Sequence, residues 1–256
     1  MPFVEEQTRL SIKNILLATV FTEPSEAILA YAVGLARRYI SKISLTGAAS
    51  PVAICETIRK CKADLVVIGT QAQDVRKSDV GVAVGEILSN VPCPMLIVGP
   101  GVRPVELSKE GFERIVYVTD YTISSLEGLP YALALSRDLG AQLRFVHISE
   151  GPTMGPFHFG NSRTVAFRKR LENLLGSKLG LPQESELTVQ EGDRAERVVS
   201  IAARLNVSLI VMSARDIPDR TSPSLMWPIG TRVICRAHCP VLIVQGFSIS
   251  QNVLQA

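Results

Sequence analysis

Short apolar runs alternate with longer segments in which apolar residues recur at helical spacing along most of the chain. The run at 14–20, NILLATV, opens on a polar turn and predicts a strand. Residues 22–39 place Ile28, Tyr31 and Leu35 on one face of a helix, with acidic residues at its start and basic residues at its end, as the helix dipole favours.

The same alternation continues to residue 244 and predicts parallel βαβ units with helices on both faces of the sheet. In the first part of the chain it predicts strands at 14–20, 42–46, 64–69 and 94–98, with helices at 22–39, 50–62 and 79–91. In the second part it predicts strands at 114–120, 142–149, 186–192, 208–213 and 240–244, with helices at 125–140, 164–180, 194–206 and from about Pro228. A loop rich in glycine, proline and aromatic residues is expected at 151–162.

The chain repeats itself. NVPCPMLIVG at 90–99 returns as AHCPVLIVQG at 237–246, and Tyr31 falls on Tyr131 at an offset of 100. Further along, the offset becomes 144, so the first part lacks about 44 residues (144 − 100) that the second part has. The sequence therefore predicts two α/β domains, at 11–100 and 112–247. Each is a doubly wound, Rossmann-like parallel sheet with strand order 3-2-1-4-5.

The missing residues correspond to the end of strand 2, helix 2 and most of strand 3 of the first domain. We expect this domain to keep about four strands and to depend on its neighbour for stability. The terminal strands at 94–98 and 240–244 are too apolar to remain open edges. We therefore expect another element to cover each of them.

Composition narrows the class of protein. With 46% hydrophobic but only 5% aromatic residues, the cores should be aliphatic, as in parallel sheets covered by helices. The net charge of +3 is mild and the basic residues are scattered, which argues against nucleic-acid binding. No apolar run is long enough for a membrane helix, and the start MPFVEEQTRL does not resemble a signal peptide. Five cysteines, an odd number, favour reduced thiols and a cytoplasmic location.

The ordered set of motifs resembles the universal stress protein family. A strand followed by Asp-x-Thr, then S-x-x-x-L-x-Y-A-x-x-L-A, ADLVVIGT and C-P-x-L-I-V cover 13–100 and 113–246 in tandem. The resemblance implies the fold predicted above, antiparallel pairing of the fifth strands across a two-fold interface, and nucleotide binding in some members. In a tandem chain the strands at 94–98 and 240–244 can pair with each other, so we expect an intramolecular pseudo-dimer joined by the linker at 99–113. The binding pattern is an Asp closing strand 1, a strand 2 residue against adenine, and G-x-x-G-x9-G-[ST] after strand 4. Its glycines let backbone N–H groups approach phosphate.

Each half keeps only a fragment of this pattern. In the first half the candidate residues are Gly69, Thr70 and Gly81, but Val20 stands where the Asp belongs and Val82 replaces the hydroxyl residue. In the second half Ser213 and Asp216 replace glycines, and Asp216 would repel phosphate. Gly230 and Thr231 offer a turn and a hydroxyl one helical turn later. The second-half candidates are Asp120, Thr122, Val146, Ser213, Gly230 and Thr231.

Two functions are left open. The first is a universal stress protein without enzymatic activity, acting through contacts with unknown proteins or a second copy, with nucleotide binding weak or lost. The second is a protein that binds ATP with Mg²⁺ in the second half through Asp120 and hydrolyses it slowly. A flavodoxin-like electron carrier is a weaker third reading. Cys235, His238 and Cys239 are expected to pack rather than bind metal, because a zinc site needs four ligands. No catalytic or metal-binding residues are predicted.

Overall fold

A computed structural model describes residues 10–19, 25–47, 50–70, 77–91, 93–104, 111–119, 128–149, 186–214 and 228–245. We call residues 10–104 the first half and residues 111–245 the second half. The first half consists of β1 (Asn14–Thr19), α1 (Glu26–Tyr39), β2 (Lys42–Thr46), α2 (Pro51–Cys61), β3 (Leu65–Gly69), α3 (Lys77–Asn90) and β4 (Met95–Val98). The second half consists of β5 (Arg114–Val118), α4 (Leu129–Leu139), β6 (Gln142–Ser149), β7 (Glu186–Glu191), α6 (Arg194–Arg204), β8 (Leu209–Ala214), α7 (Pro228–Arg236) and β9 (Val241–Gln245). The loop expected at 151–162 and the helix expected at 164–180 lie outside the described residues.

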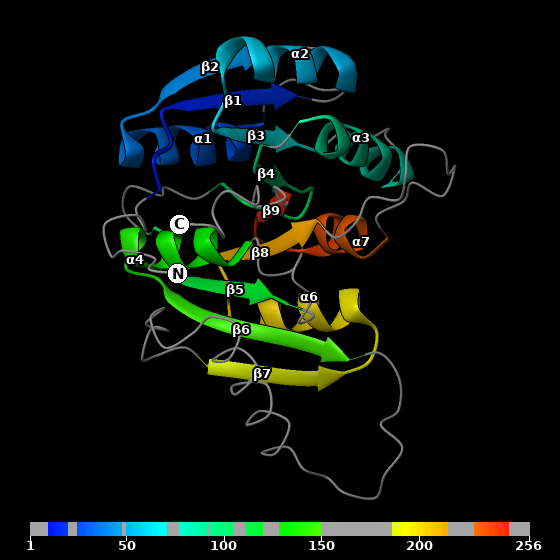
Figure 1. Cartoon of the computed structure of the whole chain (residues 1–256). Coiled ribbons are helices and arrows are strands. Elements are labelled where there is room, and N and C mark those ends of the chain that lie inside the picture. Colours follow the sequence, from blue (N-terminus) through cyan, green and yellow to red (C-terminus); the bar gives the residue numbers. More distant parts are fainter. Residues whose placement is uncertain are drawn as a thin grey trace, which may run out of the picture.

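The nine described strands form one continuous sheet in the order β2-β1-β3-β4-β9-β8-β5-β6-β7 (Figure 1). The second half has the predicted order 3-2-1-4-5, because β7, β6, β5, β8 and β9 are its third, second, first, fourth and fifth strands. The first half has four strands and no counterpart of β7 among the described residues. The predicted fold class, doubly wound α/β with a shortened first unit, is therefore confirmed.

The strand register repeats between the halves at the offsets predicted from the sequence. The offset is 100 for the first two strands, 144 for the next and 146 for the last. The matching pairs are Ile15–Ile43 with Ile115–Leu143, Ile15–Leu65 with Ile115–Leu209, and Val66–Met95 with Ile210–Val241. We call residues related by these offsets equivalent.

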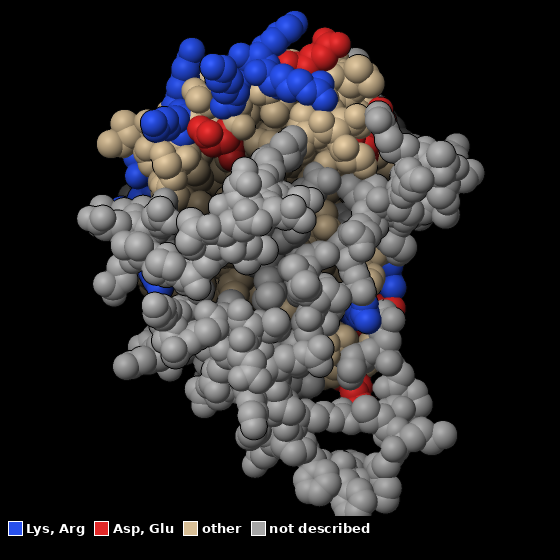
Figure 2. Space-filling model, in the orientation of Figure 1, with Lys and Arg blue, Asp and Glu red and all other residues tan. Residues whose placement is uncertain are grey.

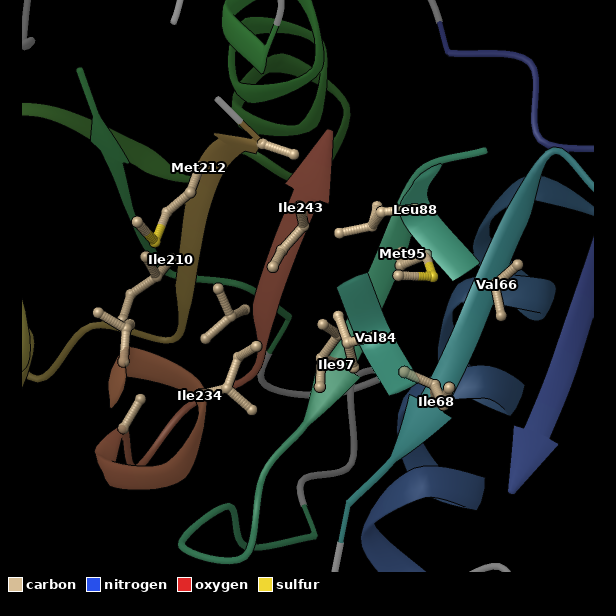
Figure 3. Close-up of a cluster of buried hydrophobic side chains, with 14 of the residues drawn as sticks. Val66, Ile68, Val84, Leu88, Met95, Ile97, Ile210, Met212, Ile234 and Ile243 are labelled. Carbon is tan, nitrogen blue, oxygen red and sulfur yellow. The ribbon is translucent and has the colours of Figure 1, made fainter. Parts of the chain in front are cut away.

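The halves meet at the one antiparallel pair among the described strands. β4 and β9 pair Met95 with Ile243 and Leu96 with Leu242. Around this pair, apolar side chains of β3, β4 and α3 meet those of β8, β9 and α7 in one continuous cluster (Figure 3). The two terminal strands thus bury each other's edges inside the chain.

Helices cover both faces of the sheet. α2, α3, α6 and α7 supply the side chains that pack against one face, and they form a row in which α3 contacts α7 across the junction. α1 and α4 cover the other face. There Tyr31 of α1 stacks on Phe112 with ring centroids 6.0 Å apart. The Tyr39 hydroxyl donates a hydrogen bond to Asp138 Oδ2 at 3.0 Å, which ties α1 to α4.

Most helices with a described start begin at a side-chain cap. Ser25 accepts the Ile28 N–H, Ser50 accepts the Ala53 N–H, and Asp193 accepts the Glu196 N–H at 2.9 Å. α4 differs, because its N-cap is Gly128, which has no side chain to offer. The N–H at the start of α4 instead has its acceptor on β8, the side-chain oxygen of Ser213.

Candidate nucleotide-binding crevices

In doubly wound sheets, ligands bind outside the carboxyl ends of the strands where the strand order reverses. This place lies between β1 and β3 in the first half and between β5 and β8 in the second. Gly69 ends β3, and Ser213 lies one residue before the end of β8. Both therefore lie at the edge of a candidate crevice, whereas Asp120 and Thr122 fall outside the described residues.

Gly69 is packed against α1. A Cβ atom added to Gly69 would overlap Ile28 Cδ1 and lie 2.7 Å from Ile28 Cγ1. Ile28 itself is fully buried. The glycine at this position is therefore required by the packing of α1 on β3, and an apolar side chain occupies the space beside it.

Ser213 is the equivalent of Gly69, and Gly128 is the equivalent of Ile28. Here the glycine is on the helix and the side chain is on the strand. The Gly128 N–H donates a hydrogen bond to Ser213 Oγ at 3.0 Å, so the hydroxyl caps α4 from a distant strand. A Cβ atom on Gly128 would lie 2.9 Å from that oxygen. The two halves thus fill the same gap in opposite ways.

Gly81 and Thr231 come from different halves and lie against each other. A Cβ atom added to Gly81 would overlap Thr231 Oγ1 and lie 2.9 Å from its Cγ2. Thr231 is 6% exposed, and its hydroxyl has no hydrogen-bond partner among the described residues. Gly230 and Thr231 lie inside α7, which starts at Pro228, and not in a turn before it. Gly81 and Thr231 thus form a close contact between α3 and α7.

Val146 and Thr70 are both buried. Val146 on β6 is 0% exposed and belongs to the cluster beneath α6. Its carbonyl accepts the Thr119 N–H at 2.9 Å, and the Thr119 carbonyl accepts a hydrogen bond from His147 Nδ1 at 2.9 Å. Thr70 donates its N–H to Val98 at 3.1 Å, while its hydroxyl has no partner among the described residues. Neither side chain offers a surface to a nucleotide.

The Cys93 and Cys239 thiols are buried at equivalent positions in the two halves. Burial raises the pKa of Cys93 and of Cys239 to about 12, so both thiols stay protonated at neutral pH. Cys93 Sγ donates to the Ala63 carbonyl at 3.2 Å. Within the described part of the chain, no three His, Cys, Asp or Glu residues come close enough together to hold a metal ion.

Sequence reasoning missed Ile28 and Gly128, which complete the packing at the two crevices. A signal for them was available, because the offset of 100 aligns Ile28 with Gly128 and the offset of 144 aligns Gly69 with Ser213. A glycine that moves from strand to helix between two aligned repeats indicates a compensated contact.

The structure also contains a cavity of about 470 Å³ that the sequence did not predict. It opens at the other end of the sheet, where the halves meet, and its lining includes Tyr31, Phe112, Ser208 and Cys239. Ser208 Oγ already donates to the Arg114 carbonyl at 2.8 Å. This cavity is separate from the candidate crevices, because Ser208 and Cys239 precede β8 and β9 whereas the crevices lie at the carboxyl ends.

Comparison with known proteins agrees with this architecture. The sequence model of the universal stress protein family matches residues 111–245, more than half of the chain. The chain therefore belongs to the universal stress protein family. No curated protein sequence matches it significantly.

Solved structures share the fold over nearly the whole chain. A universal stress protein from Archaeoglobus fulgidus DSM 4304 aligns with a TM-score of 0.65 at 15% identity, covering 94% of this chain and 99% of that chain. A putative universal stress protein from Pseudomonas aeruginosa UCBPP-PA14 aligns with a TM-score of 0.57 at 14% identity, covering 92% and 94%. At such identities the likeness concerns the fold alone. No helix in the described part of the chain combines the length and the apolar character that crossing a bilayer requires.

Proposed function

We propose that this protein is a universal stress protein without enzymatic activity, in which nucleotide binding is weak or lost. The observation that carries the proposal is the filled gap in both halves, Ile28 against Gly69 and Ser213 against Gly128. Phosphate binding needs free backbone N–H groups and space beside them. Here a methyl group takes that space in the first half, and a hydroxyl engages the N–H at the start of α4 in the second.

We further propose that the chain works as an intrachain pseudo-dimer of domains at 11–100 and 112–247. The antiparallel pairing of β4 with β9 and the contact of α3 with α7 support this arrangement. Such a module acts through protein contacts and not through a bound cofactor. All five cysteines are free, which supports a reducing, cytoplasmic location.

A thermal-shift assay with ATP and Mg²⁺ tests the loss of nucleotide binding. A ligand present at 100 times its Kd adds about 2.7 kcal/mol to the free energy of unfolding, which raises Tm by several degrees. We expect no shift at millimolar ATP, and no nucleotide released when the purified protein is denatured.

A reproducible rise in Tm would contradict the proposal and favour ATP binding in the second half. The variant Asp120→Ala then identifies the site. If binding uses the family pattern, the variant should lose the shift. A shift that survives would place the ligand elsewhere.

A further inference from the structure

The first half exposes apolar side chains whose equivalents in the second half are buried. The difference appears on the second strand and on the first helix of each half. The exposed fractions are 68% for Leu45 against 0% for Phe145, 41% for Leu29 against 1% for Leu129, and 36% for Val33 against 0% for Leu133. We call Leu29, Val33, Leu45 and the backbone of β2 the β2 edge surface.

The position of these residues on α1 shows which way they face. Tyr31 stacks on Phe112, and the Arg38 guanidinium donates to the Asp138 carbonyl, so this side of α1 faces the second half. Leu29 and Val33 lie roughly half a turn away at 100° per residue. They therefore face outward, beyond the last described strand of the first half.

The backbone of β2 is open on the same side. The Lys42 N–H donates to the Lys13 carbonyl at 2.8 Å, so Lys42 is bonded toward β1. Neighbouring residues on a strand direct their backbone groups to opposite sides, so those of Ile43 and Leu45 point away from β1. Among the described strands, β2 has no neighbour on this side.

The second half shows what covers the equivalent edge. There β7, with the sequence ELTVQE, pairs in parallel with β6 and sets Leu187 beside Phe145. An acidic residue stands at each end of this strand, and apolar and polar residues alternate between them. The fold thus contains a covered example of the edge that the first half leaves open.

Two kinds of molecule could cover β2, a second copy of this chain or a strand of another protein, and the charge around β2 distinguishes between them. On α1, β2 and α2 the exposed basic residues outnumber the acidic ones, and Figure 2 shows more basic than acidic side chains at the top of the molecule, where β2 and α2 lie. The basic residues are Arg37, Arg38, Lys42, Arg59 and Lys60, and the acidic ones are Glu26 and Glu56. Arg38 donates to the Asp138 carbonyl and Arg59 to the Asn90 carbonyl, so these two are held by other elements, whereas Lys42 is on β2 itself. Two β2 edges from two chains would bring like charges together, whereas an acidic strand is attracted.

We propose that the β2 edge surface binds an extended, acidic and apolar segment of a partner protein, which adds to the sheet as a parallel strand. The inference rests on the proposed function only in that the module acts through protein contacts. Main-chain hydrogen bonds to Ile43 and Leu45 supply affinity, and an apolar side chain set on Leu45 supplies specificity. Lys42 and its basic neighbours select for acidic ends.

Binding of a labelled peptide to the full-length protein tests this proposal. The probe has the sequence of residues 186–192, ELTVQEG, and its fluorescence anisotropy is followed up to millimolar protein. We expect saturable binding, with Kd raised at least tenfold by Leu45→Asp and several-fold by Lys42→Glu. The peptide QLTVQQG should bind more weakly, and ELPVQEG should not bind, because proline at its third position distorts the strand.

Val82→Asp is the matched control, because Val82 is 45% exposed but lies on α3, away from β2. It should leave Kd unchanged. Leu45 and Lys42 are exposed, so circular dichroism should show that every variant is folded.

The proposal is overturned if the peptide does not bind, or if its Kd is the same in Leu45→Asp and Lys42→Glu as in the unmodified protein. Light scattering tests whether a second copy covers β2 instead. A molar mass that doubles as the protein concentration rises, and that stays at the mass of one chain in Leu45→Asp, would also overturn the proposal. Neither result bears on the ATP assay, so the two proposals fail independently.

Discussion

The two halves of this protein differ at their outer edges and agree at their junction. At the outer edge, β6 is covered by β7, but β2 has no described strand beyond it. At the junction, β4 and β9 carry equivalent residues in an antiparallel pair. Because the sheet is built outward from this shared centre, the four described strands of the first half keep the same register as their equivalents although none of them corresponds to β7.

The two candidate crevices are packed equally closely, but different residues fill them. In both halves the gap between the first helix and the fourth strand of the fold is closed, but the glycine has changed sides. The close packing of this gap is therefore kept in both halves, although different residues produce it.

The largest expected difference in stability between equivalent substitutions is at the outer edges, on β6 and β2. Phe145→Ala should lower the free energy of unfolding by about 3–5 kcal/mol, because it empties a buried site where the ring also packs edge-on against Tyr117. Leu45→Ala, at the equivalent position, should change it by no more than about 0.5 kcal/mol. Urea unfolding of both variants measures the difference. Equal losses would mean that β2 is covered in solution.

A smaller effect is expected in the first-half crevice. Gly69→Ala should cost about 1–3 kcal/mol, because the new methyl group overlaps Ile28 Cδ1. Ile28→Val removes that atom, so the same glycine substitution should cost less in the Ile28→Val background. The double-mutant cycle should show a coupling of at least about 0.5 kcal/mol.

Gly47→Ala is the control for that cycle, because a Cβ atom at Gly47 has no other atom within 4 Å. It should leave stability unchanged or slightly raised. If Gly69→Ala were as harmless as Gly47→Ala, the crevice would have room for a side chain beside Ile28, and this would contradict the loss of nucleotide binding proposed above.

The smallest effect concerns the two Cys-Pro turns, where the halves should behave alike. Burial raises the pKa of Cys93 and of Cys239 from 9.0 to about 12. Between these values the folded protein holds protons that the unfolded chain has lost, so stability should fall as pH rises above 9, and be unaffected below it. Cys93→Ala and Cys239→Ala should each reduce the loss of stability between pH 8 and pH 10 by about 1 kcal/mol.

Urea unfolding at the two pH values measures this loss. The Asp64 carboxylate also raises the pKa of Cys93, whereas the equivalent residue near Cys239 is the neutral Ser208. Burial is the larger cause, so the two variants should agree. A much larger effect at Cys93 would show that Asp64 dominates and that the turns are not equivalent.

Much of the fold could be predicted from residues alone. The strands at 42–46 and 142–149 were predicted with the bounds that the structure has, because a short apolar or alternating run between turns has few other conformations in a globular protein. The shift of offset from 100 to 144 identifies the strand that has no counterpart in the described part of the first half. The candidate site was harder to predict. Gly69, Gly81 and Ser213 were identified as remnants of a binding loop, but each is engaged in internal packing.

The amino-acid sequence by itself determined the order of elements, the duplication and the last strand of each half. These depend on periodicity and repetition, which are properties of neighbours along the chain. Only the tertiary structure decided that Ile28 fills the space beside Gly69, that Thr231 lies on Gly81, and that Leu45 is exposed where Phe145 is buried. These outcomes depend on which surfaces meet after folding, and the residues that make each contact are 41 to 150 positions apart (69 − 28 and 231 − 81).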